Sequence, residues 1–132
     1  MRCETLGISV QLAGVFASGL LVGGSTYCYC DASVEIIDKK NRWENHACSY
    51  GFSLPVVALS FCLLPKIVSR IAIGVKNAQE VHAAVEWCTQ ACSTRQEGQD
   101  EQHLVKVIPG EFWRSAVRLG LLSLPIELFD SL

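Results

Sequence analysis

The sequence lacks ionised side chains over two long stretches. No Asp, Glu, Lys or Arg occurs from Thr5 to Cys30 or from Asn45 to Pro65. As a helix, the first stretch would be about 39 Å long at about 1.5 Å per residue, enough to cross a hydrocarbon core of about 30 Å. The second stretch contains an apolar segment, Ala47 to Leu64, close to the shortest length of a spanning helix. The sequence therefore predicts a transmembrane hairpin in residues 1–65, with helices over about 5–30 and 46–65 and a polar loop over 31–45.

Clustered charge of one sign is also missing. The 11 Lys and Arg residues nearly balance the 13 Asp and Glu residues, which leaves a formal net charge of -2. A nucleic-acid-binding protein needs grouped cations to neutralise phosphates, so we expect no nucleic-acid partner. Half of the residues are hydrophobic and the mean hydropathy is +0.29, which argues against a disordered chain. A signal peptide is disfavoured because Glu4 follows Arg2 and because the apolar stretch is long.

Motifs of catalysis are absent as well. The sequence contains no phosphate-binding GxxxxGK[ST], no GxSxG nucleophile elbow and no HExxH zinc motif. Its acids, serines and histidines form no recognisable triad or pair of carboxylates. No ionisable side chain lies inside the predicted spans, which argues against an ion pathway. We therefore expect no enzyme activity, no cofactor and no small-molecule substrate.

What the first stretch does contain is small residues at a spacing of four. Small side chains let helix backbones approach closely in lipid, where van der Waals contact drives association. Only one of the three pairs is a true GxxxG. We expect these residues to pack against the second helix or against helices of other membrane subunits, with lipid as the remaining neighbour: Ala13 and Ala17, Gly14 and Ser18, Gly19 and Gly23.

Seven cysteines are many for this length, and an odd number cannot all pair within the chain. Cys28, Cys30 and Cys48 fall at the same end of the predicted hairpin and are disulfide candidates if that side faces an oxidising space. With His46 they also form a weak Cys₃His candidate for zinc, since their one-residue spacings are shorter than usual. The favoured interpretation is free thiols that pack as small hydrophobic groups.

After Pro65 the pattern changes to that of an extramembrane tail over residues 66–132. Apolar residues from Ile67 to Cys92 recur at helical spacing, which predicts an amphipathic helix that ends near Thr94. His82 lies on its apolar stripe and is expected to be a satisfied interfacial histidine. Glu111 to Leu132 is too interrupted to span a bilayer, so we expect a helix that lies in the membrane interface or docks on a protein surface.

Together these features predict an all-α membrane protein: a two-helix transmembrane hairpin, an amphipathic helix and a C-terminal interfacial or docked helix. The expected function is a non-catalytic accessory subunit of a multisubunit complex, such as a respiratory electron-transport, ATP synthase or photosynthetic complex. The expected location is the mitochondrial inner membrane, with a plastid thylakoid as the alternative. Two other functions stay open: a small homo-oligomeric or pore-type membrane protein, and a soluble helical interaction domain.

Overall fold

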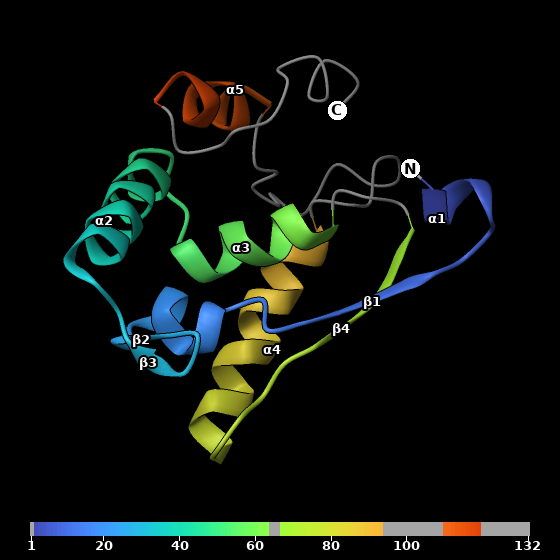
Figure 1. The fold of residues 1–132 in the computed structure, drawn as a ribbon, viewed down its shortest axis with the longest axis horizontal. Helices are drawn as coiled ribbons and strands as arrows, with labels where there is room; N and C mark the ends of the chain where they lie inside the picture. Colours follow the sequence, from blue (N-terminus) through green and yellow to red (C-terminus); the bar gives the residue numbers. More distant parts are fainter. Residues whose placement is uncertain (1, 64–66, 94–109, 120–132) are drawn as a thin grey trace, which may run out of the picture.

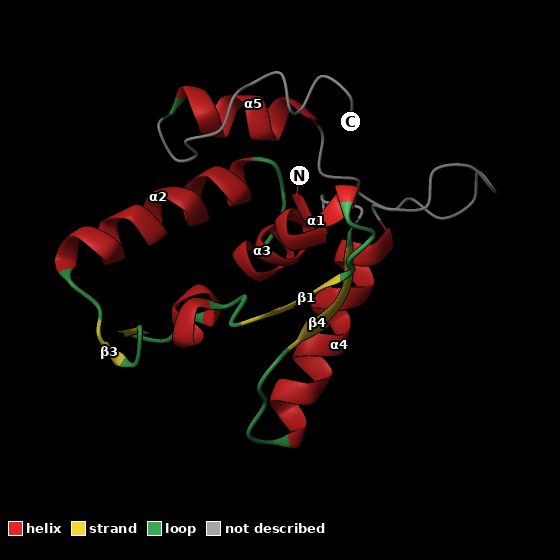
Figure 2. Ribbon diagram, turned by 45° about the vertical axis from the view of Figure 1, so that its right-hand side comes forward, coloured by secondary structure: helices red, strands yellow, loops and turns green. Residues whose placement is uncertain are grey.

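The computed structural model describes residues 2–63, 67–93 and 110–119, and it is a mixed α/β structure (Figure 1). A short parallel pair of strands packs with one face toward α3 and α4, and a separate small hairpin lies nearer to α2 (Figure 2). The elements follow in this order: α1 (Arg2–Thr5), β1 (Val10–Ala13), the 3₁₀ segment η1 (Ala17–Val22), β2 (Thr26–Tyr27), β3 (Cys30–Asp31), α2 (Val34–Ser49), α3 (Leu54–Leu63), β4 (Val68–Ala72), α4 (Ala78–Ser93) and α5 (Gly110–Arg118).

The first charge-free stretch does not form one long helix, so the first predicted membrane span is wrong. It contains β1, η1 and β2 instead. An α-helix needs φ near about −63° throughout, whereas Gly14 has φ 71° and Gly23 has φ 97°. These left-handed glycines turn the chain after β1 and after η1. The same small residues that predicted helix packing therefore interrupt the helix.

The second charge-free stretch divides between two helices, so the second predicted span is also wrong. α2 ends at Ser49, and α3 begins at Leu54 at an angle of 90° to it. Gly51 takes φ 76° at the break, and Pro55 in the first turn of α3 suits a helix start because proline has no N–H to satisfy. None of the helices in residues 2–63, 67–93 and 110–119 is individually long and apolar enough to cross a membrane, although α2 and α3 taken together pass a test of length and composition.

The strands β1 and β4 pair in parallel, with Leu12 opposite Ile71 and Ala13 opposite Ala72. Parallel neighbours need a crossover connection, which α2 and α3 supply here. β4 occupies the start of the predicted amphipathic helix over residues 67–92, so that prediction is wrong before Ala78. Ile71 and Ile73 alternate with exposed residues, a period of two that places both on the core side of the strand.

The core lies between α3 and α4. Val56 and Leu59 of α3 meet Ala91 of α4, and each is at most 2% exposed. α3 is apolar on nearly every side, which is typical of a helix surrounded by its own protein as well as of a membrane span. Here Phe16, Ile73 and Trp87 pack around the same cluster, so residues of the chain itself cover α3.

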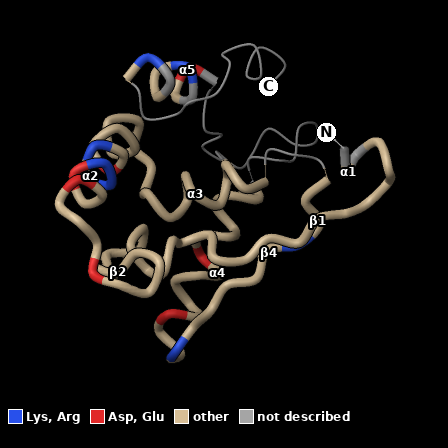
Figure 3. The backbone as a smooth tube through the Cα atoms, viewed as in Figure 1, with Lys and Arg blue, Asp and Glu red and all other residues tan. Residues whose placement is uncertain are grey.

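α5 docks on α2 through an aromatic cluster. Phe112 is fully buried, its ring lies 4.5 Å from the ring of His46, and its carbonyl oxygen is 3.1 Å from His46 Nε2. Arg42 Nη2 donates to the Leu119 carbonyl at 2.6 Å. The described part of the predicted C-terminal helix is therefore docked on protein. Figure 3 shows charged residues gathered on α2 and α5, with single ones on β4 and at the β2–β3 hairpin.

These observations correct the predicted fold class, which is α/β and not an all-α transmembrane hairpin. The predicted integral-membrane localisation depended on the two spans and is withdrawn with them. The assignments to the mitochondrial inner membrane or the thylakoid, and to respiratory electron transport, are withdrawn for the same reason. The predicted division of the chain at residue 65 falls outside the described residues and stays a prediction.

Candidate functional site

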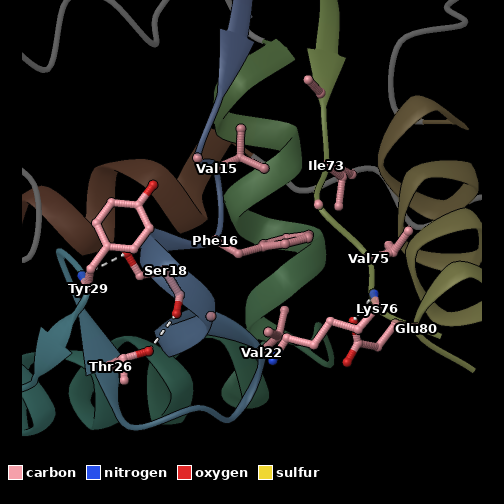
Figure 4. Close-up of a pocket in the computed structure, with 14 residues that line it drawn as sticks. Val15, Phe16, Ser18, Val22, Thr26, Tyr29, Ile73, Val75, Lys76 and Glu80 are labelled. Atoms are coloured by element: carbon pink, nitrogen blue, oxygen red, sulfur yellow. Dashed lines mark hydrogen bonds between the residues drawn. The ribbon is translucent and has the colours of Figure 1, made fainter.

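A cavity of about 620 Å³ opens where the parallel strands β1 and β4 end (Figure 4). The chain leaves both strands at this edge of the sheet, and the segments that follow them form the walls. Ligands of parallel α/β proteins bind at the carboxyl ends of the strands, and pockets of about 300–1,000 Å³ are typical of small-molecule sites. The position and the size of the cavity therefore make it the candidate binding site.

The first wall is the loop between β1 and β3. Gly14, Val15 and Phe16 follow β1, and Ser18 and Gly19 form a kink with non-helical backbone angles inside the 3₁₀ segment. Thr26 donates from its hydroxyl to the Ser18 carbonyl at 2.7 Å, and the Tyr29 N–H donates to Ser18 Oγ at 3.4 Å. These bonds hold the loop against the β2–β3 hairpin. Many of its backbone amides belong to small residues, so a ligand can approach the main chain closely.

The backbone around this wall is strained. Cys28 and Tyr29 form the tight turn between β2 and β3, and both have positive φ, 50° and 65°. Ala17 and Ser18 are also in the left-handed region, with φ 49° and 60°. Non-glycine residues in this region cost on the order of 1–3 kcal/mol each and cluster at functional sites. The turn projects Tyr29, 95% exposed, at the rim of the cavity.

The second wall is the connection from β4 to α4. Ile73, Gly74 and Val75 lead to Lys76, and Asn77 caps the helix by accepting from the Glu80 N–H at 2.9 Å. Glu80 reaches back, and its Oε2 accepts from the Lys76 N–H at 2.8 Å. This reciprocal arrangement is a variant of the capping box. It fixes the amino end of a 16-residue helix at the cavity, where the helix dipole favours negative charge.

The chemistry of the lining suits binding more than acid–base catalysis. Val15, Phe16, Val22, Ile73 and Val75 make it largely apolar. Lys76 and Glu80 are the charged side chains among the described lining residues, and the Lys76 side chain runs toward Val22 across the cavity (Figure 4). The Glu80 carboxylate is already engaged by the Lys76 amide. A ligand with an anionic group and an apolar ring would match this combination.

Phe16 connects the cavity to the core. Its ring lies 5.6 Å from the ring of Trp87 in an edge-to-face arrangement, and both pack against the cluster of Val56, Leu59 and Ala91. Such aromatic pairs contribute about 0.5–1.5 kcal/mol beyond their buried area. The cavity wall is therefore continuous with the best-packed part of the molecule, which favours a preformed site.

The small residues predicted to pack membrane helices lie mostly around this cavity. Gly14, Ser18 and Gly19 line it. Ala17 lies beside them in η1, and Gly23 ends η1 with its N–H bonded to the Leu20 carbonyl. Ala13 is the last residue of β1 and is exposed. The structure thus brings these six residues to one loop and strand end.

The candidate metal and disulfide residues are placed in different elements. Cys28 and Cys30 lie in the β2–β3 hairpin, and Cys48 and His46 lie near the end of α2. All three cysteines are exposed free thiols, and His46 is buried against Phe112. Among the residues that the structure describes, no group of three or more His, Cys, Asp or Glu side chains could hold a metal ion.

Sequence reasoning missed the cavity because its lining residues are individually unremarkable. One local signal was present: Asn77 followed three residues later by Glu80 is a helix-start pattern, and a lysine directly precedes it. Another was the glycine-rich run from Gly14 to Gly24, which the charge-free window assigned to a membrane helix. Neither signal alone shows that the two segments meet, because they are about sixty residues apart in the sequence.

Comparison with known proteins adds one relative. The chain is 32% identical over 121 residues to a pyridoxal 4-dehydrogenase from Microbacterium luteolum. The match covers 89% of this chain and 31% of the relative, so the chain spans about a third of the length of that dehydrogenase. No family model matches the chain. No solved structure matches it either. The similarity to part of an enzyme points toward an enzyme and away from the predicted non-catalytic role.

Proposed function

We propose that the chain forms the cofactor-binding part of a dehydrogenase, with the cavity at the carboxyl ends of β1 and β4 as the site of a phosphate-bearing nucleotide. The observation that carries the proposal is the position of this cavity at the carboxyl ends of a parallel pair of strands, beside the amino end of α4. The similarity to pyridoxal 4-dehydrogenase supports the reaction class. A nucleotide cofactor would supply hydride transfer, which no side chain of the lining provides.

The residues present fit such a group. The anionic phosphates would lie near the amino end of α4 and beside the Lys76 ammonium group, whose positive charge would offset that of the Glu80 carboxylate at the same helix end. In the Gly14–Gly19 loop, the Ala17 and Gly19 amides already donate to the Gly14 and Phe16 carbonyl oxygens, so the phosphates would be held chiefly on the Lys76 side of the cavity. Phe16 and Val15 give an apolar surface for a ring and exclude water from it. The chain's own contribution is therefore to bind and orient.

Lys76 is the sharpest test of this site. Removing a charge-assisted contact to phosphate costs about 1.5–3 kcal/mol, which corresponds to roughly 10- to 150-fold in affinity. We expect Lys76→Met to weaken binding of NAD⁺ or NADP⁺ by that factor, measured by isothermal titration calorimetry. Lys39→Met is the matched control, because Lys39 is exposed on α2 and does not line the cavity. Equal affinities for Lys76→Met and the parent chain would contradict the phosphate assignment, and absence of nucleotide binding up to millimolar concentration would contradict the proposed function itself.

The function as an accessory subunit stays a prediction, but the two membrane spans on which it was based are not formed in the structure. A folded interaction domain agrees better with the α/β structure than a membrane subunit does.

A further inference from the structure

The turn between β2 and β3 carries unusual residues for its shape. Tyr27 pairs with Cys30, so the loop of this hairpin consists of Cys28 and Tyr29. Both loop residues have positive φ, 50° and 65°, as a type I′ turn requires. Asparagine followed by glycine is the usual choice in such a turn, because a Cβ atom is strained in the left-handed region. This chain places a thiol and a large aromatic ring there instead, despite the backbone strain.

The position of the Tyr29 ring offers a reason for tolerating that strain. The side chain is 95% exposed, more than any other large hydrophobic side chain in the described part of the chain, so it adds little to the core. The residue nevertheless lines the candidate cavity together with Val15 and Phe16. Figure 4 shows the ring extending from the turn above Ser18. The turn therefore presents an aromatic face where a ligand of the cavity could contact it.

Hydrogen bonds hold this turn at the cavity. The Thr26 hydroxyl donates to the Ser18 carbonyl oxygen at 2.7 Å, and the Tyr29 N–H donates to Ser18 Oγ at 3.4 Å. Strained backbone persists where the surrounding structure fixes it, and such residues cluster at sites that bind ligands. A tyrosine side chain has two rotatable torsions, so ordering it against a ligand loses little conformational entropy. The ring is thus held ready for contact by its backbone.

We propose that Tyr29 is a ring-stacking residue of the cavity, on which the planar base of the bound nucleotide lies. The inference rests on the proposed function, which places the phosphates on the Lys76 side of the cavity. Tyr29 belongs to the other wall, so the base and the phosphates would be recognised by separate elements of the fold. Stacking of a base on an aromatic side chain corresponds to roughly 5- to 150-fold in affinity when the ring is removed.

Glycine substitutions at the two turn positions separate the ring from the backbone. Tyr29→Gly removes the ring and relieves the strain at its own position, whereas Cys28→Gly relieves the strain next to it and keeps the ring; Cys28 does not line the cavity. By isothermal titration calorimetry, we expect Tyr29→Gly to weaken binding of NAD⁺ or NADP⁺ at least about fivefold. We expect Cys28→Gly and Tyr29→Phe to stay within about twofold of the parent chain, because both keep an aromatic face. Neither glycine variant should melt at a lower temperature than the parent, a result that a structural role of the ring would not give.

Two mononucleotides identify which base lies on the ring. Adenosine monophosphate and nicotinamide mononucleotide each carry one planar base and one phosphate group. The one whose affinity falls in Tyr29→Gly carries the base that stacks, and unchanged affinity for both would overturn the inference.

The calorimetry also distinguishes failure of the inference from failure of the proposed function. Nucleotide binding that is indifferent to Tyr29→Gly would overturn the stacking role alone. Equal weakening by Cys28→Gly would overturn it as well, because the shape of the turn and not the ring would then be what matters. Absence of nucleotide binding by the parent chain would defeat the proposed function and the stacking role together.

Discussion

Leu59 is expected to support both the stability of the chain and the shape of its cavity. It is 1% exposed in α3, and Val56 and Ala91 surround it. Phe16, which lines the cavity, packs against the same cluster. Leu59→Ala removes buried carbon atoms and leaves a void beside them, a change that costs about 2–4 kcal/mol when the neighbours relax only partly. This is a large part of the roughly 5–15 kcal/mol that stabilises a domain of this kind.

Urea denaturation measures this effect directly. With a denaturant dependence near 2 kcal/mol per molar urea, we expect Leu59→Ala to lower the unfolding midpoint by about 1–2 M. Val81→Ala is the control, because Val81 is 43% exposed on α4 and should change stability by less than about 0.5 kcal/mol. If Leu59→Ala costs no more than this control, the packing of α3 against α4 is not the core of the protein.

Two further predictions concern the loop and the thiols. Gly24→Ala should destabilise the chain by about 1 kcal/mol or more and weaken nucleotide binding, because an added Cβ would lie 2.8 Å from the backbone carbonyl oxygen of Gly19. Thermal melting measures the change in stability, and calorimetry measures the change in nucleotide affinity. If neither quantity changes, the loop moves freely and the predicted clash does not occur. Burial raises the pKa of the Cys62 thiol, and burial together with the nearby Cys92 raises the pKa of Cys88. These two thiols should therefore react with a disulfide reagent more slowly than the exposed thiols of Cys28, Cys30, Cys48 and Cys92, and their reaction rates should rise only at higher pH. Uniform reactivity in mass-spectrometric labelling would refute the burial of α3 against α4.

The membrane prediction failed for an identifiable physical reason. Absence of charge does not show that a segment avoids water, since most residues from Thr5 to Cys30 are exposed. Where a charge-free segment is buried, as in α3, the absence does not show whether lipid or protein covers it. α3 is apolar on nearly every side, and its neighbours are α4, Phe16 and Ile73. A helix of ten residues is also too short to span, and its length depends on the turn at Gly51 and on Pro55, which a charge-free window overlooks.

The part of the site that local sequence encodes is the helix start at Asn77 and Glu80. A capping pattern depends on residues three apart, so sequence alone can predict it. The cavity forms where Gly14 and Gly74 meet. These two glycines follow β1 and β4, and only the parallel pairing of the two strands brings them to the same edge of the sheet. Pairing across a long crossover depends on the packing of α2 and α3, and no local pattern specifies it.

By itself, the sequence determined where glycines and prolines end the regular segments, and where Asn77 and Glu80 begin a helix. Those properties follow from side chains and their near neighbours along the chain. Only the tertiary structure decided that apolar segments cover one another, that β1 lies beside β4, and that a glycine-rich loop meets the amino end of α4 around one cavity. The physical reason is that burial rewards any apolar partner equally, so the choice among partners is made by packing of the whole chain.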